Sequence, residues 1–138
     1  MLKISENEIQ KLCQYAVDEY PNECCGILLG SKRTGSVQEI YRAKNVAAID
    51  RKNLHFLMNP LELYRVELEA EKNHMEIVGF YHSHTDYPAV LSAEDISFMI
   101  QGCVYLVVPV MKGICGEIKC FMKENGDGEV YEITTDCG

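Results

Sequence analysis

Residues 76–95 of the chain read EIVGFYHSHTDYPAVLSAED, and this stretch joins an apolar segment to a pair of histidines and then to a helix start. Residues 76–82 are predicted to form a β-strand. Because side chains alternate between the two faces of a strand, His82 and His84 point the same way, about 7 Å apart along it. Two imidazoles that converge on one point make half of a divalent-metal site.

Ser92 and Asp95 follow where a turn should lead into a helix. This spacing is typical of a helix N-terminus, in which the serine caps the helix and the acidic residue lies near its dipole. We expect that role to coexist with metal binding, because a capped main chain would hold the Asp95 carboxylate rigidly towards the histidines. Two imidazoles and one carboxylate leave a fourth position for water, as in catalytic zinc sites. The sequence therefore predicts a zinc site formed by His82, His84 and Asp95.

Hydrolysis at such a site also needs a base that is not itself a ligand. The candidates are Glu23, Asp86 and Glu94. Glu94 should point away from Asp95 into solvent, and Asp86 lies close to the histidines but also suits a turn. Glu23 stands at the entrance of an apolar segment, residues 24–29, where partial desolvation would suit a proton shuttle. Taken alone, Glu23 also fits a surface glutamate at the mouth of a strand.

The rest of the chain alternates between helical and extended patterns. A helix is expected between a Ser5 cap and Pro21, a second follows Asn59-Pro60, and a third begins after Ser92. The second helix should bury Leu61, Tyr64 and Leu68, and the third should turn Ile96, Met99, Ile100 and Cys103 to one face. Strands are expected at residues 24–29, 37–41, 54–58, 76–82, 104–110, 116–122 and 129–134. This order indicates an α/β sandwich on a mixed central sheet, in a single domain of residues 1–138.

The composition fits a globular protein, with 47% hydrophobic and 25% charged residues in a chain of 138. A net charge of −8 argues against a nucleic-acid partner, and the longest apolar stretch, residues 104–111, is too short to span a bilayer. The N-terminus lacks a signal-peptide pattern, so we expect a cytoplasmic protein. The odd count of seven cysteines, without any C-x-x-C pair, favours reduced and mostly buried thiols over a disulfide framework.

These residues together resemble the signature of the JAMM/MPN metalloprotease family: a distal glutamate, then His-Ser-His, seven residues, serine, two residues and aspartate. The matching positions are Glu23, His82, Ser83, His84, Ser92 and Asp95. Residues 21–30, PNECCGILLG, also resemble the family segment P-x-E-x-C-G-x-L-x-G. Thr85 and Leu91 stand where many relatives carry proline, which affects the expected shape of the loop and not its ligands.

The resemblance implies a cytidine-deaminase-like fold, with zinc held by the two histidines, Asp95 and water. It implies that Glu23 is the general acid/base and that Ser92 stabilises the oxyanion. Members of the family process ubiquitin or ubiquitin-like tails, and short versions resemble those that act on sulfur carriers ending in Gly-Gly. We therefore expect a zinc-dependent peptidase or isopeptidase that cleaves an amide at the C-terminal tail of a small ubiquitin-like or sulfur-carrier protein.

The main alternative is a non-catalytic MPN-type scaffold, because many members lack the metal ligands and serve in assembly. The retained polar residues argue against it, since buried ligands are costly without metal. The metallo-β-lactamase pattern H-x-H-x-D-H is matched through Asp86, but Tyr87 replaces its last histidine. A two-histidine, one-carboxylate iron oxygenase would use the same donors and leave Glu23 without a role. Contact of His55 or Asp86 with the substrate remains open at this level.

Overall fold

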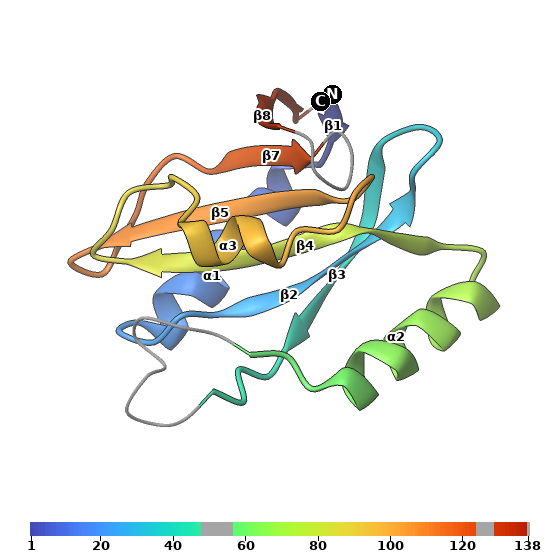
Figure 1. Cartoon of the computed structure of the whole chain (residues 1–138), viewed down its shortest axis with the longest axis horizontal. Helices are drawn as coiled ribbons and strands as arrows, with labels where there is room; N and C mark the ends of the chain where they lie inside the picture. Colours follow the sequence, from blue (N-terminus) through green and yellow to red (C-terminus); the bar gives the residue numbers. More distant parts are fainter. Residues whose placement is uncertain (48–56, 124–128, 138) are drawn as a thin grey trace.

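The computed structural model describes residues 1–47, 57–123 and 129–137. Within these ranges one mixed sheet has the strand order β8-β7-β5-β4-β2-β3-β1-β9, and β6 pairs with β5. The strands are β1 Leu2–Lys3, β2 Cys25–Ser31, β3 Ser36–Ala43, β4 Glu76–Thr85, β5 Val104–Met111, β6 Ile114–Cys115, β7 Lys119–Lys123, β8 Val130–Ile133 and β9 Thr135–Asp136. The predicted mixed sheet flanked by helices is confirmed (Figure 1). The single-domain organisation stays a prediction.

The helices are α1 Glu6–Glu19, α2 Pro60–Lys72 and α3 Ala93–Ser97. Their predicted starts are confirmed: the Ser5 hydroxyl accepts from the Glu8 amide, and the Asn59 side chain accepts from the Leu61 amide. In the described part of the chain, no helix combines the length and apolar character needed to cross a bilayer. The expected cytoplasmic location stays a prediction.

The two faces of the sheet bury different helices. On one face, Leu28 and Tyr81 pack with Leu12 and Ala16 of α1. On the other face, Ile27 and Leu29 pack with Val66 and Ala70 of α2. Figure 1 shows α1 behind the sheet and α3 in front of β4 and β5. The alternation of side chains in β2 and β4 thus separates the α1 side from the side that carries α2 and α3.

The connection from β4 to β5 determines where the predicted site lies. These strands are parallel, with His82 opposite Val107, and parallel neighbours require a crossover over one face of the sheet. The crossover contains α3 and passes over the face shared by Phe80, His82 and His84. The topology therefore brings Asp95, in the first turn of α3, above the two histidines.

Two details of the predicted helices are wrong. In α2, Leu61, Tyr64 and Leu68 are exposed, while Val66 and Ala70 face the sheet. Val66 and Ala70 are smaller, so they let α2 approach β2 closely. Close packing, and not hydrophobicity alone, therefore determines which face of the helix is buried. The third helix stops at Ser97, although Met99 is buried beyond it.

Two other expectations are affected. Most of the predicted strand 54–58 lies outside the described residues, and Leu57 and Met58 are not in a strand. The structure joins Cys13 of α1 to Cys115 of β6 in a disulfide, across 102 residues of sequence, so the expectation of reduced thiols is wrong for this pair. The free cysteines are Cys24, Cys25, Cys103 and Cys120, all buried, and the exposed Cys137.

Candidate metal centre

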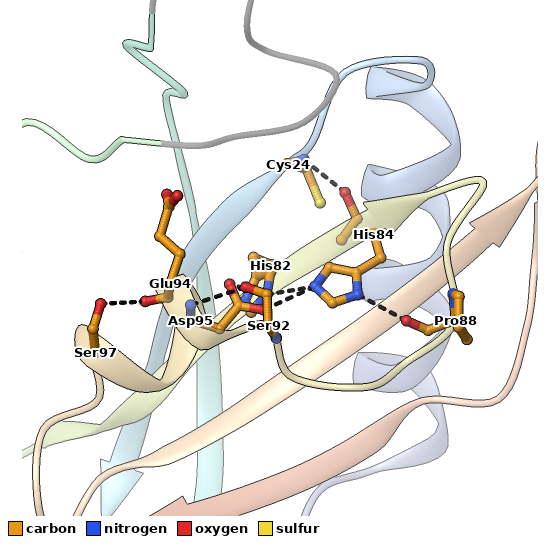
Figure 2. A network of polar contacts seen from close by, with 9 residues as sticks. Cys24, His82, His84, Pro88, Ser92, Glu94, Asp95 and Ser97 are labelled. Carbon is orange, nitrogen blue, oxygen red and sulfur yellow. Dashed lines mark hydrogen bonds and ion pairs between the residues drawn. The ribbon is translucent and has the colours of Figure 1, made fainter.

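His82, His84 and Asp95 converge on one point above the sheet. One possible ligand atom from each residue lies within 4.8 Å of the other two. The two Nε2 atoms are 3.1 Å apart; Asp95 Oδ1 lies 3.3 Å from His82 Nε2, and Asp95 Oδ2 lies 3.1 Å from His84 Nε2. Both histidines are buried, and Asp95 is partly buried. The structure thus brings together the three residues that the sequence predicts as ligands (Figure 2).

The N-terminus of α3 fixes Asp95 by a reciprocal pair of hydrogen bonds. The Asp95 amide donates to Ser92 Oγ, and the Ser92 amide donates to Asp95 Oδ2, both at 3.0 Å. This is a capping box with aspartate in the third helical position. The same carboxylate therefore caps the helix and faces the histidines, as the sequence analysis expected.

A main-chain carbonyl orients the ring of His84. Its Nδ1 lies 2.8 Å from the Pro88 oxygen, to which it donates. A neutral imidazole that donates through Nδ1 presents the lone pair of Nε2, and a carbonyl bonded to the distal nitrogen is the usual support of a metal-binding histidine. Tyr87 packs its ring 4.9 Å from the His84 ring. The sequence could not single out Pro88, because every residue has a main-chain carbonyl.

The environment favours an ionised carboxylate beside a neutral His82. At Asp95, burial raises the pKa, but the hydrogen bonds and charges of the two histidines outweigh it and hold the pKa well below its usual range. Burial lowers the pKa of His82 more than the neighbouring Asp95 raises it. At His84, burial also lowers the pKa, yet the bonds to Asp95 and Pro88 together raise it.

The donor set fits zinc. Two imidazole nitrogens and one carboxylate oxygen are the three protein ligands of many catalytic zinc sites, and they leave one position free. Neutral His82 and ionised Asp95 are already in the protonation states that a metal ligand requires. The choice of zinc stays a prediction.

Glu23 lies just before β2, next to this cluster. β2 is antiparallel to β4 with Cys25 opposite His82, so Glu23 reaches the level of His84 on the same face. The residue is 8% exposed, and burial, with the charges of Asp95 and Glu94, raises the pKa of Glu23 to about 8 against the opposing effect of His84. A buried glutamate with a pKa near neutrality is suited to proton transfer.

Ser83, the middle residue of the His-Ser-His motif, has a structural position on the opposite face. Its hydroxyl accepts from the Cys24 amide at 2.7 Å, and its own amide donates to the Cys24 carbonyl at 3.0 Å. Ser83 thereby binds the residue that follows Glu23 to the strand that carries the histidines.

The triad and Glu23 open into one groove of about 610 Å³. Phe80 and Tyr105 form its floor beyond His82, with their ring centroids 5.6 Å apart. Apolar side chains from both sides complete it: Leu57, Met58, Leu63, Leu91, Phe98 and Ile100. The groove thus has apolar walls around a polar centre.

The other two candidate bases have different surroundings. Asp86 accepts from the Tyr20 hydroxyl at 2.6 Å and from the Lys112 amide at 2.7 Å, and its φ is +57°. These contacts match the turn role that the sequence allowed. Glu94 is exposed, and Figure 2 shows its side chain directed away from the triad. His55 lies outside the described residues.

Comparison with known proteins places this geometry in a family. The sequence profile described as "Prokaryotic homologs of the JAB domain" matches residues 5–121. A desampylase of Pyrococcus furiosus is 28% identical over 91 residues, which cover 66% of this chain and 61% of that protein. A desampylase of Haloferax volcanii is 34% identical over 80 residues, 58% of this chain and 56% of that protein. The chain thus spans about three fifths of the length of these relatives.

Solved structures share the fold over nearly the whole chain. A protein of Desulfitobacterium hafniense is 28% identical with a TM-score of 0.79, covering 99% of this chain and 92% of that one. A protein of Salinibacter ruber is 26% identical with a TM-score of 0.74, covering 98% and 90%. A JAB1/MPN domain protein of Archaeoglobus fulgidus, at 23% identity and a TM-score of 0.60, shows the same fold over 99% and 97%.

Proposed function

The chain belongs to the prokaryotic branch of the JAMM/MPN family, and from this membership we propose that it is a zinc-dependent isopeptidase or peptidase. Its substrate would be an amide at the C-terminal tail of a small ubiquitin-like protein. The observation that carries the proposal is the buried Glu23 beside a His-His-Asp cluster in one groove. The two relatives named desampylases, which act on a small ubiquitin-like modifier, support the substrate class.

His82, His84 and Asp95 would hold the metal in this proposal. Zinc bound there would supply a Lewis acid for the carbonyl and lower the pKa of a water to about 7. Glu23 would then take a proton from the attacking water and return it to the leaving amine. Its raised pKa, about 8 by burial, suits the return step, and a nearby dication would favour the ionised form that the first step needs.

Ser92 would stabilise the negative charge that develops on the carbonyl oxygen. Its Oγ accepts from the Asp95 amide, so its own proton remains available to a second acceptor. A donor held in place by a helix cap needs little reorganisation during the reaction. Ser92 thus serves the helix and the proposed reaction through different parts of one hydroxyl.

The groove favours a flexible tail over a folded loop. An extended chain without side chains near the scissile amide, such as Gly-Gly, could approach the buried cluster closely, and main-chain hydrogen bonds would supply much of the affinity. A sulfur carrier with such a tail is the specific version of this proposal, with a C-terminal cysteine or short adduct as the released group.

The test combines metal content with turnover. The purified protein should carry about one zinc per chain and cleave an adduct from a Gly-Gly-terminated carrier, and Glu23→Gln should lower kcat by about 10³-fold or more while retaining zinc. Zinc at one per chain with no cleavage of any ubiquitin-like tail would contradict the proposal and favour a scaffold.

A further inference from the structure

Asn45 is a buried side chain two residues after β3, with 8% of its surface exposed. Its Nδ2 donates to the main-chain carbonyl of Glu23 at 2.9 Å. Its Oδ1 accepts from the amides of Ala47 and Leu57, at 3.0 and 3.1 Å. One amide group therefore ties three main-chain positions together, and the sequence offers no motif that would have singled it out.

The bond to Glu23 lies where the sheet ends. The pairing of β2 with both neighbours begins at Cys25, opposite Ala43 on β3 and His82 on β4. Glu23 precedes this ladder, so regular strand pairing does not fix its carbonyl. Asn45 follows β3, and its side chain supplies a hydrogen bond to the Glu23 carbonyl beyond the point where the pairing of β2 with β3 ends. Glu23 is the proposed acid/base.

The bond from the Leu57 amide to Oδ1 supports part of the groove wall. Leu57 lines the groove, and its carbonyl also accepts from the Val46 amide at 2.8 Å. Asn45 therefore holds Leu57, which lies next to Met58 in the lining of the groove. A shift of Asn45 would move Glu23 and this wall together.

We infer that Asn45 is a positioning residue for the hydrolysis proposed above, which sets the placement of Glu23 relative to the triad. The inference rests on the proposed function. Asn45 lies outside the predicted ligand set, so its loss should leave metal affinity unchanged. Because a misplacement of about 1 Å in a catalytic group can cost about 100-fold in rate, Asn45→Ala should lower kcat by about 30- to 100-fold.

The test starts with Asn45→Ala and a matched asparagine. Asn73 also donates from Nδ2 to a main-chain carbonyl, that of Glu69, but it lies at the far end of α2. Asn73→Ala should keep wild-type kcat. In the Glu23→Gln background, Asn45→Ala should cause no further loss of kcat, because both changes act through one group. Zinc affinity should stay within about two-fold in every variant, since the ligands are untouched.

A second variant separates the two halves of the amide and covers the case in which alanine prevents folding. Asn45→Asp keeps an oxygen for Ala47 and Leu57 but loses the donor to Glu23. It should lower kcat while hydrogen exchange of the Ala47 and Leu57 amides stays slow, whereas Asn45→Ala should accelerate that exchange.

The outcomes are distinct for the two proposals. Full kcat in both Asn45 variants, or losses that add to that of Glu23→Gln, would overturn the inference while leaving the hydrolase intact. Loss of zinc in Asn45→Asp would also overturn it, because the residue would then support the ligands. A wild-type protein that binds zinc and cleaves no tail overturns the proposed function, and the inference with it.

Discussion

The two sides of the groove are held by different kinds of contact. On the metal side, the three ligands and the hydrogen bonds that orient His84 and Asp95 come from residues 82–95, through a strand, a Pro88 carbonyl and a helix cap. On the other side, Glu23 depends on distant segments: its neighbour Cys24 binds Ser83 across 59 residues, and its own carbonyl binds Asn45 across 22. The metal side is thus specified locally, and the acid/base side by tertiary structure.

Loss of a metal ligand should have the largest effect on turnover, because the protein would then no longer bind the metal. Asp95→Ala should abolish zinc binding and reduce turnover to background, a loss of at least about 10⁴-fold. Metal analysis after dialysis and cleavage of a carrier adduct measure the two effects. Glu67→Ala, at an exposed position on α2 outside the lining of the groove, provides the control and should keep both zinc and activity. Zinc retained at one per chain in Asp95→Ala would contradict the proposed ligand set.

Glu23→Gln should impair the acid/base side and leave metal binding on the other side unchanged. The substitution preserves shape and removes the proton carrier, so kcat should fall by about 10³-fold or more while zinc stays bound. Glu39→Gln changes an exposed glutamate on the neighbouring β3 and should leave kcat unchanged. A Glu23→Gln protein that releases its zinc would place Glu23 among the ligands and erase the proposed division between the two sides.

Ser92→Ala should give a smaller loss, because it removes one donor and one cap. We expect kcat to fall by about 10- to 100-fold and the free energy of unfolding to fall by about 1 kcal/mol. Ser5 caps α1 in the same way, through the Glu8 amide, and lies away from the groove. Ser5→Ala should therefore cost similar stability with no change in kcat. Equal kcat in Ser92→Ala and Ser5→Ala would mean that Ser92 acts only as a helix cap.

The contrast between local contacts on the metal side and long-range contacts around Glu23 explains which features could be predicted from the sequence. The triad follows from strand alternation in His82 and His84 and from helix-start chemistry in Ser92 and Asp95, which are both local rules. The mixed sheet follows from the order of its elements. The burial of Val66 in place of Leu61 and the pairing of Cys13 with Cys115 depend on which surfaces meet in three dimensions. Local pattern carries no information on such long-range packing, and the support of Glu23 by Asn45 belongs to the same class.

The last expected effect concerns stability and not turnover: the free energy of unfolding of the metal-free protein should depend on pH. Burial raises the pKa of Glu23 from 4.5 to about 8 in the folded chain. Between these values the folded protein holds a proton that the unfolded chain has released. The contribution of Glu23 is therefore complete below pH 4.5 and is lost as the pH rises towards 8, so the free energy of unfolding should decline over this interval.

Glu23→Gln isolates that contribution, because other groups titrate in the same interval. The raised pKa of His84 acts in the same direction as Glu23, and the lowered pKa of His82 acts in the opposite direction. Both histidines remain in the variant, so the difference between the two unfolding curves, measured by urea denaturation from pH 5 to 9, reports Glu23. The wild type should lose stability relative to the variant as the pH rises. Parallel curves would mean that the Glu23 carboxylate is well solvated, and the acid/base side would then lack the desolvation on which its proposed role depends.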